Sequence, residues 1–408
     1  MIKKSFWSIL LLGLTFGMMV SCGDDDTKGF DDYKTVTDDD DDDDDNKENN
    51  NNNNNDDNNK SDSTIVVRDS IAVAIVWDGT SVSLTGDVDS ITFTKSGADV
   101  VITSTTDKFL EITLSGSTTD GSLLVNSLKK YGIILNGVSI TNSDGPAINN
   151  QCGKSLYVTL TEGTENKLVD GGTYAESAID QKGTLFSEGQ IYFGGTGSLS
   201  VVGNAKNGIA SDDYIIVNNG NITIDVEDTG SNGIKVNDGF TMNDGTLNIT
   251  VSADGGRGIK SDARTTIAGG AITITTSGDC VTETVEGVED ASSAAGIKCD
   301  SLFMMTAGTL NITSKGDGGK GINCSDTIKF CGGTLYAETK GGNDEGKPKA
   351  VKGDKGIIVS GGAFTAKCVK SWAIDNGVDT ENVQERITIV GTPTTKTLQK
   401  RNVVVKYE

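Results

Sequence analysis

The feature that most constrains this sequence is a repeat of twenty-five residues. The triplets Ile222-Thr223-Ile224, Leu247-Asn248-Ile249 and Ile272-Thr273-Ile274 recur at that interval, and so do Gly233-Ile234-Lys235 and Gly258-Ile259-Lys260. A fixed period between about 20 and 50 residues is typical of stacked repeats, in which each unit contacts mainly its neighbours. Every motif in such a chain is therefore one position in a column of equivalent positions.

The content of one repeat selects the fold. Each repeat holds three short runs of alternating apolar and polar residues, separated by turns such as Gly269-Gly270 and Gly332-Gly333, and the chain has 52 glycines but three prolines. Three strands in twenty-five residues are too short for a βαβ unit or a propeller blade. We therefore predict an all-β, right-handed, single-stranded parallel β-helix. It should have about eleven coils with about 4.8 Å between equivalent strands.

The period of two within each strand assigns the faces of the coil. Ile222, Ile224 and Val226 should point inward, whereas Thr223 should point outward in a polar ladder. In the short strand after Gly258, Ile259 should point inward and Lys260 outward. The predicted core is a stack of aliphatic side chains, so function should lie on the outer surface.

The N-terminus predicts secretion and a lipid anchor. Residues 1–21 carry two lysines, an apolar run and a small final residue, which is the pattern of a signal peptide. The ending Val20-Ser21-Cys22 resembles the lipobox of bacterial lipoproteins, so Cys22 should carry lipid and anchor the chain to a membrane. The acidic run Asp24-Asp25-Asp26 resembles a signal for export to the cell surface. We expect an outer-membrane lipoprotein exposed on a Gram-negative cell; ordinary secretory cleavage near Cys22 is the alternative.

The segment 22–62 should be a disordered linker between the anchor and a β-helix domain at 63–408. From Gly23 to Asp62 it contains seventeen acidic residues and four lysines, including the unbroken run Asp38–Asp45. Such a segment cannot bury enough apolar surface to fold, and a solvated spacer explains the run better than a calcium buffer does. The rest of the chain is also acidic, within a total charge of −23, which excludes nucleic acid as an expected partner. The oligomeric state is not encoded visibly; a monomer is expected.

The cysteines after Cys22 follow the repeat. Cys299 and Cys324 lie twenty-five residues apart, so their side chains should lie parallel on neighbouring coils. This arrangement favours free, buried thiols over a disulfide, although an oxidising compartment permits either.

Two columns of aspartates flank the short strand, and each repeats on successive coils. The upstream Asp column precedes the strand and contains Asp228, Asp254, Asp279, Asp317 and Asp344. The downstream Asp column follows it and contains Asp212, Asp238, Asp262, Asp300, Asp326 and Asp354. Carboxylates about 5 Å apart repel and need cations between them, and calcium prefers oxygen ligands. We predict Ca²⁺ ligands among Asp254, Asp262, Asp279, Asp300, Asp317 and Asp326. The alternative is neutralisation by lysines such as Lys260.

These elements together carry a resemblance to a known family. The run Leu135–Ile140, the motif Asp144–Ile148, the run Leu160–Asn166 and the repeated Gly-Ile-Lys-x-Asp element resemble the pectate-lyase-like β-helix family of bacterial carbohydrate-binding proteins. The resemblance implies a surface β-helix that binds calcium and plant-cell-wall-type polysaccharide without known cleavage. The chain departs from the motif where Ala210 and Asn323 replace the lysine.

Three functions are consistent with the outer face. A non-catalytic module would hold plant-cell-wall or acidic glycan through Lys260, Lys298, Lys352 and Trp372, although a cap aromatic is the more ordinary role for Trp372. A calcium-dependent polysaccharide lyase would use Lys260 or Lys298 as its base. A structural or adhesive surface protein would need neither glycan contacts nor a catalytic base. We predict the binding module, with no catalytic residue.

Overall fold

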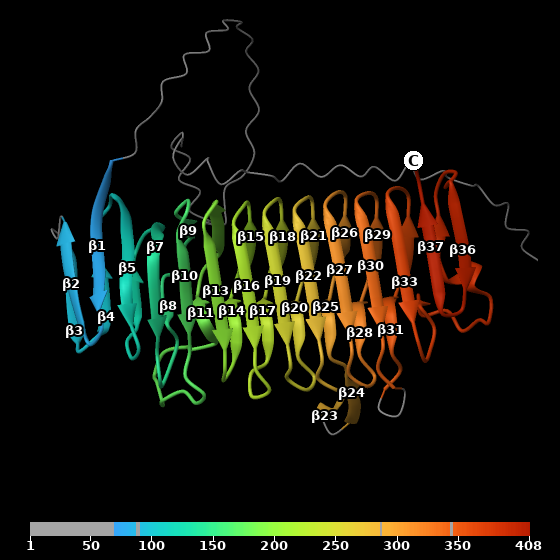
Figure 1. Ribbon diagram of the computed structural model, residues 1–408, viewed down its shortest axis with the longest axis horizontal. Helices are drawn as coiled ribbons and strands as arrows, with labels where there is room; N and C mark the ends of the chain where they lie inside the picture. The colour runs from blue at the N-terminus through green and yellow to red at the C-terminus, as the bar shows by residue number, and fades with distance from the viewer. Residues whose placement is uncertain (1–68, 87–89, 286–287, 343–345) are drawn as a thin grey trace, which may run out of the picture.

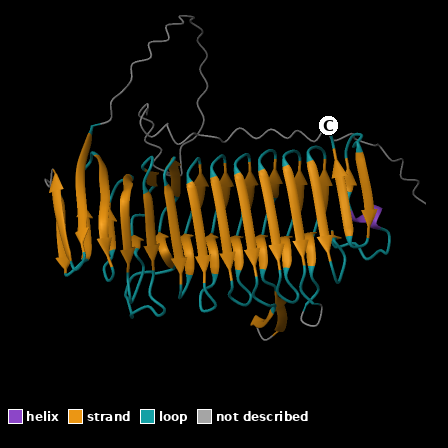
Figure 2. Ribbon diagram, in the orientation of Figure 1, coloured by secondary structure: helices purple, strands orange, loops and turns teal. Residues whose placement is uncertain are grey.

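The computed structural model describes residues 69–86, 90–285, 288–342 and 346–408, with backbone alone over 283–291. The predicted signal peptide, Cys22, the predicted linker and Asp344 therefore lie outside the described residues. Within them, the chain forms a rod of stacked strands (Figure 1). Nearly all regular structure is strand, as Figure 2 shows, and this confirms the predicted parallel β-helix of about eleven turns. No helix in the described part is long and apolar enough to cross a membrane.

Each coil contributes one strand to each of three faces, and the faces belong to two sheets. We call the 23-stranded sheet the long sheet and the 12-stranded sheet the short sheet. The short sheet contains β3 (Ile91–Ser96), β4 (Asp99–Ser104), β6 (Leu123–Ser127), β8 (Ile148–Asn150), β11 (Gly183–Ser187), β14 (Asn207–Ser211), β17 (Asn232–Val236), β20 (Arg257–Ser261), β25 (Ala295–Cys299), β28 (Lys320–Cys324), β31 (Lys349–Gly353) and β34 (Ile374–Asp375).

The long sheet supplies the other two faces, which join at β7. One face contains β1 (Ser70–Asp78), β5 (Phe109–Thr118), β7 (Tyr131–Thr141), β10 (Glu165–Val169), β13 (Ser198–Gly203), β16 (Asn221–Val226), β19 (Thr246–Val251), β22 (Ala271–Thr276), β27 (Thr309–Ser314), β30 (Thr334–Thr339) and β33 (Ala363–Cys368). The other contains β9 (Leu156–Leu160), β12 (Ile191–Gly195), β15 (Tyr214–Val217), β18 (Gly239–Met242), β21 (Arg264–Ile267), β26 (Phe303–Met305), β29 (Thr327–Phe330), β32 (Gly356–Val359) and β35 (Thr388–Ile389).

The register of the strands confirms the predicted faces. β16 and β19 pair in parallel with Ile222 opposite Leu247 and Ile224 opposite Ile249, and these side chains are buried. Asn248 lies opposite Thr223 and is exposed. In the short sheet the isoleucines Ile234, Ile259, Ile297 and Ile322 form one buried row. Stacking of like aliphatic side chains therefore makes a continuous core along the rod.

The glycine that opens each Gly-Ile element is required by close packing between the sheets. A Cβ placed on Gly258 would lie 2.4 Å from Cγ2 of Ile274 and 2.6 Å from the carbonyl oxygen of Gly296. The same crowding occurs at four equivalent glycines. A Cβ there would approach the side chain sixteen residues later or the carbonyl oxygen of the next coil, at Gly208, Gly233, Gly296 and Gly321. The repeat thus fixes how closely the short sheet approaches the long one.

Antiparallel strands close both ends of the rod. At the N-terminal end β1 pairs with β2 (Ser81–Gly86), and β3 pairs with β4. At the C-terminal end β37 (Asn402–Lys406) pairs with β33 and β36 (Thr395–Gln399). A short 3₁₀ helix, η2 (Val383–Arg386), adjoins this cap. These antiparallel pairings cover an edge that a bare coil would expose.

One insertion interrupts the regular stacking. The segment before Gly296 forms a hairpin, β23 (Val281–Val285) with β24 (Val288–Ser292), that projects from the rod beside β25 and β28 (Figure 1). Its acidic side chains Glu283, Glu286, Glu289 and Asp290 lie outside the described side chains. The thirteen residues by which this repeat exceeds twenty-five thus place a projecting hairpin next to the short sheet.

The cysteine ladder forms as predicted. Cys299 lies opposite Cys324 on neighbouring coils, and both are free and fully buried. The hydrogen bond between the two thiols, together with burial, raises the pKa of Cys299 well above its ordinary value. Cys152, Cys280 and Cys368 are also free and buried.

Candidate functional site

The outer face of the short sheet presents two columns of side chains. The first position of each strand supplies Asn207, Asn232, Arg257, Ala295, Lys320 and Lys349. The fourth position supplies Phe186, Ala210, Lys235, Lys260, Lys298, Asn323 and Lys352. In these columns the residues on β11 and β14 are neutral, whereas those on β20 through β31 are cations except Ala295 and Asn323.

The cationic part of this face is hollowed into a cavity of about 560 Å³, which we call the basic pocket. Its lining includes six cationic residues and two carboxylates, namely Arg257, Lys298, Lys320, Lys347, Lys349 and Lys352 with Asp354 and Asp375. The total charge of the chain is −23. A concentration of positive charge in so acidic a protein marks the pocket as a candidate anion-binding site.

Several of the pocket lysines are held in place by neighbours. The Nζ of Lys349 donates a hydrogen bond to Oγ of Ser371 over 3.1 Å and lies 3.8 Å from a carboxylate oxygen of Asp375. Burial lowers the pKa of Lys349. Lys352 forms an ion pair with Asp354 over 2.6 Å. Lys347 is exposed and has no ion pair within the described parts of the chain.

Lys260 lies on the coil between Lys235 and Lys298. Burial lowers its pKa, and although Asp262 counteracts this effect, the nearby Arg257 and Lys235 reinforce it. Unlike Lys235 and Lys298, Lys260 has no ion pair with any described residue. The lysine column therefore contains one member that loses its proton more readily than an ordinary lysine.

Two further hollows continue the same face toward the N-terminal end. They measure about 610 and 420 Å³ and share Lys182, Ala205 and Lys206. Tyr174 lines the larger one; its ring faces Lys206 Nζ at 4.8 Å, and its hydroxyl donates to Asp170 over 2.7 Å. We call the basic pocket and these two hollows, which follow one another along the short sheet as separate depressions, the groove.

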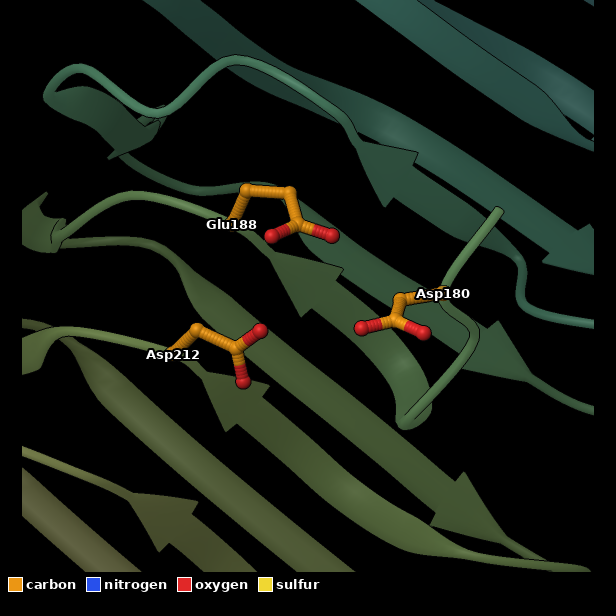
Figure 3. Close-up of side chains that lie close together, drawn as sticks. All are labelled: Asp180, Glu188 and Asp212. Atoms are coloured by element: carbon orange, nitrogen blue, oxygen red, sulfur yellow. The ribbon is translucent and has the colours of Figure 1, made fainter. Parts of the chain in front are cut away.

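One group of carboxylates has the geometry of a metal site. Ligand oxygens of Asp180, Glu188 and Asp212 lie within 4.8 Å of one another, and the three side chains converge in Figure 3. The ammonium group of Lys182 lies 2.7 Å from Asp180 and also bonds to Asp212. Burial opposes the charged form of Lys182, but these hydrogen bonds outweigh it and raise its pKa. The oxygen donors suit calcium, but a lysine already supplies a cation there.

We expect Glu188→Gln to stabilise the fold at neutral pH and not at acidic pH. Burial, followed by the Asp212 carboxylate, raises the pKa of Glu188, so its ionised form is disfavoured in the folded state. Gln carries no charge, so the gain should be full above the raised pKa and should vanish as pH falls through it. Solvent screening limits the gain to about 0.5 kcal/mol. Thermal melts at several pH values measure it; the exposed Glu162→Gln is the control. A gain that does not change with pH would contradict the assignment.

The structure gives all six predicted calcium ligands protein partners. In the upstream Asp column, Asp254 accepts a hydrogen bond from the backbone N–H of Asp279 over 2.8 Å, and Asp279 accepts one from Asp317 over 2.7 Å. Asp317 in turn accepts one from Gly342. This column is therefore a ladder that joins successive coils.

In the downstream Asp column the partners are lysines. Asp262 pairs with Lys235, Asp300 with Lys298, and Asp326 with Lys355 over 2.7 Å. The hydrogen bond from Lys298 outweighs burial and lowers the pKa of Asp300. Calcium on these predicted ligands remains a prediction, and an ion there would compete with the lysines.

The predicted polysaccharide contacts fall in different places. Lys298 and Lys352 line the basic pocket, and Lys260 borders it. Trp372 lies at the C-terminal end, where Arg386 and Lys400 pack against its ring at 4.2 and 4.4 Å. Its stacking on sugar remains a prediction, which would require these cations to move.

Sequence reasoning missed four cations of the basic pocket: Arg257, Lys320, Lys347 and Lys349. Arg257 and Lys320 directly precede the glycine of the Gly-Ile element, and Lys349 precedes the equivalent Ala350. The column is therefore visible in the sequence as a periodic basic residue, but the predicted short strand began only at its glycine. Lys347 belongs to a turn with no periodic signal.

These features define a class of protein: a parallel β-helix with an extended groove on the outer face of its short sheet. Grooves of this kind suit extended polymers, because equivalent side chains repeat at each coil.

Two matches to one family model, described as "Carbohydrate-binding domain-containing protein", cover residues 96–263 and 251–346. The chain belongs to this family. A relative of that description from Acetivibrio thermocellus is 32% identical over 117 residues, which are 28% of this chain and 41% of the relative. The chain thus spans about two-fifths of that relative's length. A solved structure, described as the polysaccharide lyase-like protein from C. thermocellum in a gadolinium derivative, is similar with a TM-score of 0.50 and 26% identity, over 65% of this chain and 100% of that one.

Proposed function

We propose that this protein is a lipid-anchored cell-surface protein that binds acidic polysaccharide along the groove without cleaving it. The observation that carries the proposal is the basic pocket, because the described side chains of its lining include six cations and two carboxylates. Carboxylate or sulfate groups on a glycan would form charge-assisted hydrogen bonds there. The two hollows toward Tyr174, which both contain Lys182 and Lys206, would extend the contact to further sugar units.

The direct test is equilibrium binding to a panel of polysaccharides. We expect polygalacturonate and other polyanionic glycans to bind in 50 mM NaCl, and binding to weaken several-fold in 0.5 M NaCl as salt screens the pocket. Neutral glucans and mannans should bind more weakly and with little dependence on salt. Equal affinity for neutral and acidic glycans would refute the acidic preference, and no retention on any glycan would refute the function.

The anchor is a separate part of the proposal. It is supported by the sequence Val20-Ser21-Cys22 and by the polar segment that follows it. Cys22→Ser should abolish incorporation of labelled fatty acid and release the protein from membranes. Protease treatment of intact cells should remove the domain if it faces outward, and protection of the domain would contradict surface exposure.

Calcium binding is a further part of the proposal. The lysines that already pair with the carboxylates would compete with the ion. Lys182→Met removes the ammonium group from Asp180, Glu188 and Asp212, so we expect calcium to bind this variant at least tenfold more tightly than the parent protein. Calorimetric titration with CaCl₂ measures the affinity. Lys154→Met, a change away from the cluster, is the control. Equal affinities would show that calcium binds elsewhere, with the two Asp columns as the remaining candidates.

A lyase is the second candidate, and Lys260 is the observation that favours it. β-Elimination requires a base to remove the proton beside a uronate carboxylate, and a lysine with a lowered pKa suits that role. An unsaturated product that absorbs in the ultraviolet should then appear on mixing with polyuronate, and Lys260→Met should abolish it. If polyuronate binds but no unsaturated product forms, the protein binds the polymer without cleaving it.

A further inference from the structure

We propose that the acidic run Asp38–Asp45 of this same chain occupies the basic pocket when no polysaccharide is bound. The run and the pocket have opposite charge. Eight consecutive aspartates would meet a cavity whose described side chains include six cations and two carboxylates. An extended aspartate run repeats its carboxylates along the chain, as an acidic polysaccharide does.

The cations suit such an occupant because they repeat along the rod. Lys298 and Lys352 lie on β25 and β31, two coils apart, and Arg257 lies on β20 at one side. Equivalent positions on neighbouring coils are about 4.8 Å apart, so the pocket presents charge over three coil spacings, about 14 Å. Exposed Lys347 lies at the rim. An extended run of five residues covers this distance, at about 3.4 Å per residue.

The connecting chain is long enough to reach. The rod begins at β1, and seven coil spacings along the long sheet lead from β1 to β22, whose coil contains Arg257. The pocket therefore begins about 34 Å from the start of the rod. Residues 46–68 connect Asp45 to the rod, and twenty-three residues extend to about 80 Å. A random coil of twenty-three residues has a root-mean-square span of about 26 Å, so a chain of this length reaches the pocket with moderate extension.

Attachment to the same chain makes weak contacts effective. A connection of this length would keep the run near the pocket at an effective concentration of about millimolar. When a site is occupied most of the time, its apparent affinity for a competitor is the intrinsic affinity multiplied by the fraction of sites that are free. The acidic run would therefore act as an internal competitor, so that only glycans with dense negative charge displace it. This consequence for glycans rests on the proposed function, whereas the contact itself does not.

The contact is tested without glycan by carbodiimide cross-linking, which joins carboxylates to lysines. The full mature chain is treated at low concentration, and the cross-linked peptides are identified by mass spectrometry. We expect peptides containing Asp38–Asp45 joined to Lys347, Lys352 or Lys298, and far fewer joined to Lys129, Lys154 or Lys396. Salt at 0.5 M should suppress them. Cross-links spread evenly over surface lysines, or found only between two molecules, would overturn the proposal.

The consequence is tested by neutralising the run in the full chain. We expect substitution of all eight residues Asp38–Asp45 by asparagine to raise the affinity for polygalacturonate about tenfold in 50 mM NaCl and less than twofold in 0.5 M NaCl. The matched control replaces eight other linker aspartates by asparagine: Asp24, Asp25, Asp26, Asp31, Asp32, Asp56, Asp57 and Asp62. An equal gain in this control would show that net charge, not the run, governs affinity, and would overturn the proposal. Specific cross-links without any glycan binding would instead support the contact and refute the proposed function.

Discussion

Reversing the charge of Lys347 and Lys352 together is expected to weaken binding of acidic polysaccharide at least about a hundredfold. Both residues line the basic pocket, and neither is deeply buried. A hydrogen bond to a charged group contributes about 1.5–3 kcal/mol, so two lost contacts correspond to about 10²-fold or more in the dissociation constant. Lys347→Glu, Lys352→Glu adds repulsion to that loss. Calorimetric titration with polygalacturonate oligomers measures the change.

The control for this double variant must carry the same change in net charge. Lys396→Glu with Lys406→Glu, two exposed positions in the C-terminal cap, meets that condition. We expect less than a twofold effect on affinity. The fold should survive in both variants, because the Lys352–Asp354 ion pair is near the surface and contributes little. Equal weakening in the two variants would mean that the pocket is not the binding site.

The fold was predictable because its information is periodic. Each strand contributes to one core, and the alternation in Ile222-Thr223-Ile224 by itself indicates which face of the strand is buried. The register then follows from the repeat length, since equivalent residues must stack. Caps and insertions lack this redundancy. The pairing of β1 with β2 and the hairpin β23–β24 each occur once, so no neighbouring coil indicates them.

The site was predictable only in part, because its charges are decided by contacts between coils. The sequence places Lys235 beside Asn237 and leaves Asp262 as a candidate metal ligand, but the structure pairs Lys235 with Asp262 across the coil boundary. Whether a column of carboxylates is neutralised by calcium or by lysine depends on such distances. The same holds for Asp254, whose acceptor role needs the backbone N–H of Asp279 on the next coil.

The glycine column shows how the sequence records packing that only the structure explains. Gly258 faces Ile274, sixteen residues later, and the same offset relates Gly208 to Ile224 and Gly296 to Ile312. In the later coils the partner becomes smaller: Gly321 faces Ala337. In the next coil, both positions of this offset are alanines, Ala350 and Ala366, and both are fully buried. A residue with a Cβ is therefore present on the short sheet where the facing residue is alanine instead of isoleucine.

From this pattern we expect Gly258→Val to prevent stable folding and Gly258→Ala to destabilise by about 2–3 kcal/mol. An added Cβ would lie 2.4 Å from Ile274 Cγ2 and 2.6 Å from the Gly296 carbonyl oxygen, so both the side chain and the neighbouring coil must shift. Ile274→Ala alone should cost about 2–5 kcal/mol through the cavity it leaves. The double variant Gly258→Ala, Ile274→Ala should lose less than the sum, because each change relieves the other.

Chemical denaturation of the four proteins measures this coupling, and Gly153→Ala is the control. A Cβ on Gly153 would have no atom within 4 Å, so we expect a change within about 0.5 kcal/mol. Rescue should be partial, because Ile274→Ala leaves the contact with the Gly296 carbonyl in place. Strict additivity would mean that this backbone contact alone excludes a side chain at Gly258. A coupling of about 1 kcal/mol or more would instead establish that the facing isoleucine selects glycine, and with it the close approach of the two sheets.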